Sequence, residues 1–401
     1  MFPVAERTRQ ISESITLAVS AKANAMKKAG IDVVGFGAVE PDFDTPGFIK
    51  EAAKTALDKG QTKYTPTPCL VELKEAIAKK FNVENGLPYK ADQITTGAGG
   101  KHCLYMAFMA TLNPGDEVIL PSPYWVSYPE QIKLAGGTPK VIRGEESNNF
   151  KITPKQLERA IGPRTKGFII NSPSNPSGIG YTPEELKALA DVVAKHPQII
   201  VYSDEIYEKL VYNGLKFVSF ATLDPSLLDR TLTFNCHSKS FAMTGWRVGY
   251  IGGPKAAIDA INKLQSQMNS HVTSFTQMPA ALALNDPRGV ESVEQMRQQF
   301  EKRGKHMGQR LAALPNITCP QPNGAFYCFP NVSAYFGKSI NGAKITDAIS
   351  FAAALLENSH VALVPGNDSG FDTHVRLSFA TSMEQIDKGI DRIEQFLKKL
   401  G

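Results

Sequence analysis

The chain has 401 residues, enough for two domains with a large hydrophobic core. Its hydrophobic share of 42% and charged share of 21% are those of an ordinary globular protein. The net charge of +5 is small for this length and comes with no basic block, so nucleic-acid binding is not indicated, whereas an anionic ligand is compatible.

The cysteines and the N-terminal residues indicate a reducing compartment and no membrane segment. The five cysteines are an odd number and form no Cys-x-x-Cys pair, which disfavours a disulfide framework and a zinc site. Residues 1–10 are polar, and no stretch approaches the ~18 apolar residues that a membrane span needs. We therefore expect a soluble, cytoplasmic protein with no metal, membrane or nucleic-acid partner.

Apolar runs alternate with helical patterns along the chain. Helices are predicted at 11–29, at 48–59, from about 102, and over a long region from about 255 to 314 that breaks at 271–274. Strands are predicted at 33–36, 93–96, 117–120, 165–170, 199–203, 231–234, 248–251 and 374–379. The alternation predicts an α/β fold with a mostly parallel sheet and helices on both faces.

Several residues that could bind a ligand or take part in catalysis follow predicted strands. They are Gly99, Trp125, Asn175, Asp204 and Lys239. Ligands of open α/β sheets bind at the carboxyl ends of the strands. This distribution therefore predicts a single shared site.

A glycine-rich turn, residues 97–101, lies between a predicted strand and a predicted helix. The free backbone N–H groups and the dipole of that helix would both face an anion. Such a turn is equally typical of tight backbone packing. The turn alone therefore leaves both interpretations open.

The chemistry of four other features also indicates a binding site. Trp125, just past a strand end, can stack on a flat heteroaromatic ring. The loop 171–178 has two X-Pro bonds, which predict at least one cis peptide. Burial of the Asp204 carboxylate at the end of a strand would cost free energy unless the charge is paired. Arg376, inside a half-buried strand, needs an anion, and its planar guanidinium suits a carboxylate.

The most distinctive stretch lies between two predicted strands and reads Lys239-Ser240-Phe241-Ala242-Met243-Thr244-Gly245-Trp246-Arg247. A lone lysine usually lies on a solvated face. This run, however, resembles the cofactor-lysine signature of class I aminotransferases, which are pyridoxal-phosphate (PLP) enzymes of fold type I. The resemblance favours the bacterial-type aspartate (aspartate/prephenate) branch and extends from about Ser14 to the C-terminus. Further matches are Glu40–Pro46, Lys63–Pro66, Asn171–Gly178 and Asp204–Tyr207.

The resemblance implies how the cofactor ring is held. Lys239 would carry PLP covalently, and Asp204 would keep the pyridine nitrogen protonated, so that the ring acts as an electron sink. Asn175 and Tyr207 would contact the 3-oxygen, and Trp125 would stack on the ring. The residues implied for the cofactor phosphate are Gly99, Gly100, Lys101, Arg247, Ser238 and, across a homodimer interface with shared active sites, Tyr64.

The same resemblance implies the substrate contacts. Arg376 matches the arginine that binds the α-carboxylate, and Trp125 and Asn175 also border the substrate. Lys101 resembles the residue that meets the distal carboxylate of a dicarboxylic substrate, and a compact ammonium suits that task. Thr16, with Ser14, matches hydroxyl residues of the substrate site, although a plain helix start explains both equally well.

Val39 departs from the family pattern. The family usually has glycine at this position, whose backbone faces the substrate carboxylate. A β-branched residue disfavours positive φ and narrows the approach. We expect Val39 to alter the shape of the substrate pocket without affecting the cofactor.

The resemblance also implies the domain organisation. A large PLP-binding domain, residues 47–290, would contain a mostly parallel seven-stranded sheet. The N-terminal segment, residues 1–46, would join residues 291–401 in a smaller α+β domain.

The implied reaction is transamination of L-aspartate with 2-oxoglutarate to give oxaloacetate and L-glutamate, with Lys239 as the general base. Prephenate, aromatic or neutral amino acids remain alternative substrates, and a PLP β-lyase is an alternative reaction. A PLP-binding regulator without turnover would be expected to carry a DNA-binding segment, and the sequence shows no helix-turn-helix pattern.

Overall fold

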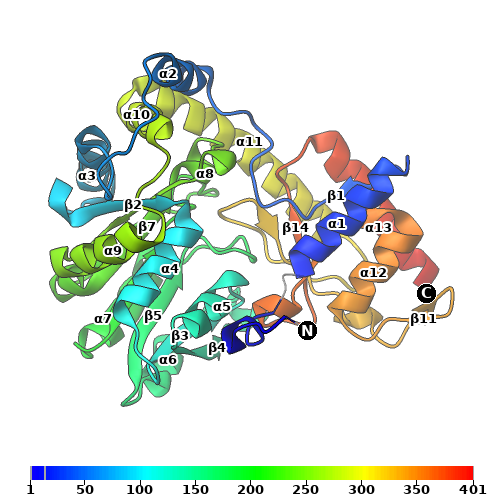
Figure 1. The fold of residues 1–401 in the computed structure, drawn as a ribbon. Helices are drawn as coiled ribbons and strands as arrows, with labels where there is room; N and C mark the ends of the chain where they lie inside the picture. The colour runs from blue at the N-terminus through cyan, green and yellow to red at the C-terminus, as the bar shows by residue number, and fades with distance from the viewer. Residues whose placement is uncertain (1, 13–14, 401) are drawn as a thin grey trace.

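The computed structural model describes residues 2–12 and 15–400, apart from the side chains of residues 15–17 and 20. Figure 1 shows a large sheet with its covering helices beside a smaller group of helices and short strands. The long helix α11 (Pro287–Ala312) runs from the first part to the second. None of the described helices has a stretch long and apolar enough to cross a membrane.

The large sheet has seven strands in the order β2-β8-β7-β6-β5-β3-β4. Only β8 is antiparallel to its neighbours, β2 and β7, so the predicted mostly parallel seven-stranded sheet is confirmed. The strands are β2 (Ile94–Ala98), β3 (Glu117–Ser122), β4 (Thr138–Arg143), β5 (Thr165–Asn171), β6 (Ile200–Asp204), β7 (Thr231–Cys236) and β8 (Val248–Gly252).

Helices cover both faces of this sheet. They are α3 (Val71–Asn85), α4 (Gly100–Thr111), α5 (Ser127–Leu134), α6 (Pro154–Ala160), α7 (Pro183–Ala194), α9 (Lys255–Met268) and α10 (Ser274–Asn285), whereas α2 (Gly47–Asp58) packs on α10. Val118 and Leu120 of β3 belong to the apolar core that α4 and α9 complete, whereas Ile119 belongs to the core completed by α7. Because successive strand residues point to opposite faces, this separation shows that β3 is buried on both sides.

The smaller part joins segments that are far apart in the sequence. Strand β1 (Val34–Gly35) pairs in parallel with β12 (Val361–Ala362), and α1 packs against α12, since Ala23 and Leu356 share one apolar cluster (Figure 1). A three-stranded sheet has the order β13-β14-β9, and β10 pairs with β11. The remaining bounds are α1 (Ile15–Lys28), β9 (Tyr327–Cys328), β10 (Ser339–Ile340), β11 (Ala343–Lys344), α12 (Ala348–Ser359), β13 (Val364–Pro365), β14 (Val375–Ser378) and α13 (Met383–Leu400).

The differences between the structure and the predicted elements include an edge strand, an extra helix break and a later helix start. Strand β4 was not predicted, because it is an edge strand with mostly exposed or half-buried residues and lacks a continuous apolar run. The long helical region breaks between Met268 and Ser274, as predicted, but it breaks again at Asp286, whose carboxylate accepts from the Arg288 N–H at 2.9 Å before Pro287 starts α11. A capping aspartate followed by proline is a typical helix start. Residues 11–12 are not helical, contrary to the predicted start.

Candidate active site

The carboxyl ends of β2, β3, β5, β6 and β7 lie at one edge of the large sheet, and β8, which runs the opposite way, begins there. A cavity of about 340 Å³ opens at this edge. The candidate residues that line it are Val39, Gly100, Lys101, Trp125, Asn175, Asp204, Tyr207, Ser238, Lys239, Arg247 and Arg376. The opposite direction of β8 explains why Arg247, which precedes a strand, joins residues that follow strands.

The carboxylate of Asp204 is buried at the end of β6, with 6% of the residue exposed. Tyr128 donates to Asp204 Oδ2 at 2.6 Å, and the backbone N–H of Ile206 donates to Oδ1 at 3.3 Å. Burial raises the pKa of Asp204 to about 6, because these hydrogen bonds offset only part of the cost. A buried carboxylate is stable as an anion beside a cation, so Asp204 suits a positively charged group in the cavity.

Lys239 lies in α8 (His237–Ser240), the single helical turn that follows β7. Its Nζ donates to the backbone carbonyl of Val39 and lies 5.6 Å from the ring centroid of Phe326. Burial lowers the pKa of Lys239 to about 8. An amine with this pKa is partly neutral near physiological pH, which is the form required of a nucleophile or a general base.

Arg247 lies against the glycine turn that begins α4. Its guanidinium donates from Nη2 to the Ala98 carbonyl at 2.9 Å and from Nη1 to the Thr244 carbonyl at 2.8 Å. Gly99 has a φ of 84°, and a Cβ there would lie only 2.3 Å from Arg247 Nη2. Glycine therefore lets a cation approach the N-terminus of a 12-residue helix, which is an arrangement suited to a phosphate.

Lys101 lies in the first turn of α4, with its Nζ 5.2 Å from the ring centroid of Trp125. The Trp125 ring in turn packs edge-on against Tyr128, with centroids 5.3 Å apart. Burial, and then the charge of Arg247, lowers the pKa of Lys101. The excess of positive charge near these two side chains favours an anionic ligand.

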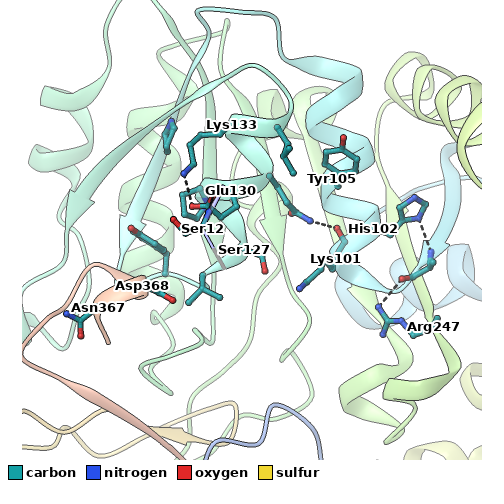
Figure 2. A pocket seen from close by; sticks show the side chains of 17 residues that line it. Ser12, Lys101, His102, Tyr105, Ser127, Glu130, Lys133, Arg247, Asn367 and Asp368 are labelled. Carbon is teal, nitrogen blue, oxygen red and sulfur yellow. Dashed lines mark hydrogen bonds and ion pairs between the residues drawn. The ribbon is translucent and has the colours of Figure 1, made fainter. Parts of the chain in front are cut away.

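A second pocket, of about 710 Å³, adjoins the cavity and shares Lys101 and Arg247 with it (Figure 2). On its other side Lys133 Nζ donates to Glu130 Oε1 at 2.7 Å, and the backbone N–H of Ser12 donates to Glu130 Oε2 at 3.2 Å. The segment that precedes α1 therefore forms part of the wall of this pocket.

Arg376 enters the cavity from β14, with 4% of the residue exposed. It donates from Nη1 to Asn175 Oδ1 at 3.0 Å and from Nη2 to the Gly37 carbonyl at 3.1 Å. Its buried Nε has no partner among the described residues. A buried guanidinium that meets only neutral acceptors is costly, so Arg376 is suited to a carboxylate.

Three tyrosines are linked to the site by hydrogen bonds, and only Tyr207 among them was predicted. Tyr207 shares a hydrogen bond of 3.0 Å with Tyr327 through their hydroxyl groups, and burial raises the pKa of Tyr207 well above its usual range. Tyr128 and Tyr327 were missed as site residues. Tyr128 lies one helical turn beyond Trp125, a spacing that could have drawn attention to it, whereas nothing near Tyr327 signals its partner.

Tyr64 stands apart from this constellation, the side chain of Thr16 lies outside the described residues, and Val39 lines the cavity. Tyr64 is 90% exposed, packs edge-on against His271 with centroids 5.6 Å apart, and does not line the cavity of its own chain. Thr16 lies in α1, but its side chain, like Ser14 as a whole, is outside the described residues. Val39 is half-exposed, is not among the described residues with positive φ, and contributes its carbonyl to Lys239.

Among the described residues, no cluster of three or more His, Cys, Asp or Glu side chains could hold a metal ion. The polar groups of the cavity are instead two lysines, two arginines, two carboxylates and hydroxyl or amide groups. Such a set suits an organic, phosphate-bearing ligand with carboxylates nearby.

Comparison with known proteins gives a consistent result. A sequence model of the family described as aminotransferase class I and II matches residues 31–393. The aspartate aminotransferase of Geobacillus stearothermophilus is 50% identical over 98% of this chain and 99% of its own. The aspartate/prephenate aminotransferase of Cereibacter sphaeroides is 49% identical over 96% of each chain. The crystal structure of the aspartate aminotransferase from Rhizobium meliloti superposes with a TM-score of 0.96 at 42% identity and covers both chains completely.

Proposed function

Because the chain belongs to the class I and II aminotransferases, whose cofactor is PLP, we propose that it transfers the amino group of L-aspartate to 2-oxoglutarate, forming oxaloacetate and L-glutamate. The observation that carries this proposal is the pair of cations Arg376 and Lys101, which line one cavity with Lys239. Two separate cations suit the two carboxylates of an acidic amino acid.

The residues of the cavity fit PLP. The buried carboxylate of Asp204 needs a cation, and a protonated pyridine nitrogen is one. The Gly99 turn beside Arg247 fits the phosphate, and Trp125 offers a flat face for the ring. Lys239, with a pKa lowered to about 8, supplies the amine. When bound, PLP supplies an aldehyde that reacts with amines and a ring that withdraws electron density.

In the proposed reaction Arg376 binds the α-carboxylate, and its unpartnered Nε gives it a donor beyond those used by Asn175 and Gly37. Lys101 meets the distal carboxylate. Together these contacts orient the amino group and the α-proton toward Lys239.

Proton transfer falls to Lys239. In its neutral form the Nζ would accept the proton from the substrate α-carbon, hold it as an ammonium and later give it up again. Asp204 would stay ionised beside the ring nitrogen of a bound PLP. Tyr207, whose pKa burial raises, would remain a hydroxyl able to donate to the 3-oxygen, and the Asn175 amide would donate to the same atom.

Prephenate is a second candidate substrate, because relatives of similar identity are named aspartate/prephenate aminotransferases. A β-lyase remains the alternative reaction, and formation of pyruvate from a cysteine-type substrate would reveal it.

The assembly and organisation of the chain are part of this proposal. A homodimer with shared active sites is supported by the 90% exposure of Tyr64, which is free to reach a neighbouring subunit's phosphate site. The division into 1–46, 47–290 and 291–401 is supported by the β1–β12 pairing. The five free cysteines support a reducing, cytoplasmic location.

The test is the visible absorption spectrum of the purified holoenzyme before and after addition of excess L-aspartate, with an assay for released oxo acid. The expected result is bleaching of the yellow band with stoichiometric oxaloacetate. A yellow protein that does not respond to aspartate would retain PLP but contradict the role of Lys101, and alanine, aromatic amino acids and prephenate would then be tested.

A further inference from the structure

A carboxylate outside the cavity links the strand that carries Arg376 to the large sheet. Glu146 lies in the loop after β4, and its Oε2 accepts from Asn331 Nδ2 at 2.9 Å and from His374 Nε2 at 3.2 Å. Its Oε1 accepts from the hydroxyl of Thr318. All three donors belong to the part of the chain beyond α11, so one side chain of the large part holds three segments of the smaller part.

His374 meets Glu146 from within an aromatic cluster. Its ring stacks on Phe329 with centroids 5.0 Å apart and a 22° interplanar angle, and it packs edge-on against Phe150 at 5.2 Å and Phe371 at 5.1 Å. Only 2% of His374 is exposed. The cluster fixes the ring plane, and with it the direction in which Nε2 points.

The protonation state of His374 follows from these surroundings. Burial lowers its pKa to about 4, and the pKa of Glu146 is also lowered, since the hydrogen bonds that it accepts outweigh its burial. The imidazole is therefore neutral and the carboxylate ionised near neutral pH. Because a carboxylate only accepts, Nε2 carries the hydrogen and Nδ1 accepts from the Thr373 hydroxyl at 2.9 Å.

His374 and Arg376 are two residues apart in extended chain, so their side chains lie on the same face. Arg376 donates to Asn175 on the large part, and His374 donates to Glu146 on the same part. The strand is thus attached at two points, one on each side of Val375. A strand of four residues has few ladder bonds to fix its position, which makes the second attachment important.

We propose that Glu146 and His374 are positioning residues that hold β14 where the Arg376 guanidinium meets the substrate α-carboxylate. This inference rests on the proposed function, because it assigns a purpose to the place of Arg376. Neither residue lines the cavity. Their effect on substrate is exerted through the strand, by preorganising the arginine before the ligand arrives.

The test compares the holoenzyme with its Glu146→Gln variant, which keeps the size of the side chain but replaces one accepting oxygen with a donor. We expect the Kd for maleate, a dicarboxylate with no amino group, and the KM for L-aspartate to rise about tenfold, the loss expected for one charged hydrogen bond. The kcat should change by less than about twofold, because the groups around Lys239 are untouched. Amide hydrogen exchange at residues 374–378 should become faster in the ligand-free holoenzyme.

The matched control is Glu158→Gln, which breaks a Glu–His pair of the same 3.2 Å length, with His196, between α6 and the turn after α7. The control should leave the Kd for maleate unchanged. If Glu146→Gln lowers the melting temperature but leaves that Kd and the exchange of β14 unchanged, Glu146 is only structural and the inference is wrong.

A second variant keeps the test decisive if Glu146→Gln does not fold. Glu146→Asp retains the charge but shortens its reach by one methylene, and it should raise the Kd for maleate by a smaller factor. An unchanged Kd in that variant, with slower or equal exchange in β14, contradicts the inference. The wild-type enzyme in the same series separates the two questions, since a wild type that gives no half-reaction with L-aspartate would overturn the proposed function instead.

Discussion

The cofactor side and the carboxylate side of the cavity are held in different ways. Asp204 and Lys239 follow strands of a seven-stranded sheet that is buried on both faces. Arg376 comes from a four-residue strand in a three-stranded sheet and depends on Asn175 and Gly37 in distant parts of the chain. The groups that we propose for proton transfer are therefore fixed by one framework, whereas the arginine that we propose for the substrate carboxylate is fixed by contacts between two frameworks.

The substitution with the largest expected effect on the cofactor side is Lys239→Ala. We expect transamination to fall by at least about 10²- to 10⁴-fold, the contribution of a positioned general base, while the cofactor remains bound noncovalently through the other residues. Steady-state kcat and the mass of the borohydride-reduced protein would measure both effects. The control Lys255→Ala removes an exposed lysine paired with Asp259 and should change neither. Covalent retention of PLP in Lys239→Ala would show that another lysine carries the cofactor.

Asp204→Asn should separate activity from stability on the same side. Loss of the buried charge that we propose to pair with the ring nitrogen should lower kcat roughly 10²- to 10⁴-fold, since breaking a buried ion pair costs about 3–5 kcal/mol. In the cofactor-free protein, by contrast, the same substitution should increase the free energy of unfolding near neutral pH. Burial raises the pKa of Asp204 from 3.8 to about 6, so its favourable contribution to the free energy of unfolding is present below about pH 4 and is lost as the pH rises through about 6.

This gain in stability can be measured by thermal unfolding of the cofactor-free proteins at about pH 8. Asp204→Asn should be more stable than the wild type by about 1–3 kcal/mol there, because it carries no buried charge. A less stable variant at that pH would mean that the carboxylate has a stabilising partner within the protein itself.

Arg376→Lys tests the carboxylate side. A lysine keeps the charge but loses the planar pair of donors. The KM for L-aspartate should rise roughly ten- to 150-fold, corresponding to about 1.5–3 kcal/mol for a charged hydrogen bond, with PLP affinity unchanged. The same substitution in Arg310, which pairs with Asp387 and Asp391 between α11 and α13, is the control. A loss of PLP affinity in Arg376→Lys would show that the two sides are not independent.

The smallest expected effect is a pH dependence of cofactor binding. The PLP aldehyde reacts with a neutral amine, and burial lowers the pKa of Lys239 to about 8. The rate at which apoenzyme develops the cofactor absorption band should therefore rise about tenfold between about pH 7 and pH 9 and then level off. Stopped-flow absorbance would follow it. A rate that keeps rising toward about pH 10.5 would mean that the amine is solvated.

The sequence was most informative where a residue's role depends on its own strand. Continuous apolar runs located β5, β6 and β7, and the strand-end positions of Asp204 and Lys239 followed from them. At least one cis peptide was predicted in the loop after β5, and the structure has two there, at Ser172–Pro173 and Asn175–Pro176. These are local signals, and local signals survive in a single sequence.

The sequence was least informative where partners come from distant segments. The Tyr207–Tyr327 hydrogen bond joins residues 120 positions apart, and the Glu146–His374 pair joins residues 228 positions apart. Neither has a periodic or turn signal that could announce its partner. The edge strand β4 was missed for a different reason, since its half-buried residues give no apolar run.

The parallel pairing of β1 with β12 has a consequence for protein synthesis. Residues 34–35 emerge early from the ribosome, but their strand partner, residues 361–362, is made more than three hundred residues later. Contacts of such long sequence separation form slowly, and chains generally fold their earlier units first. The large sheet can therefore assemble during translation. The Gly37 carbonyl, which lies next to β1, can accept its hydrogen bond from Arg376 only after residue 376 has been made. During synthesis, the carboxylate-binding end of the cavity is the last to be completed.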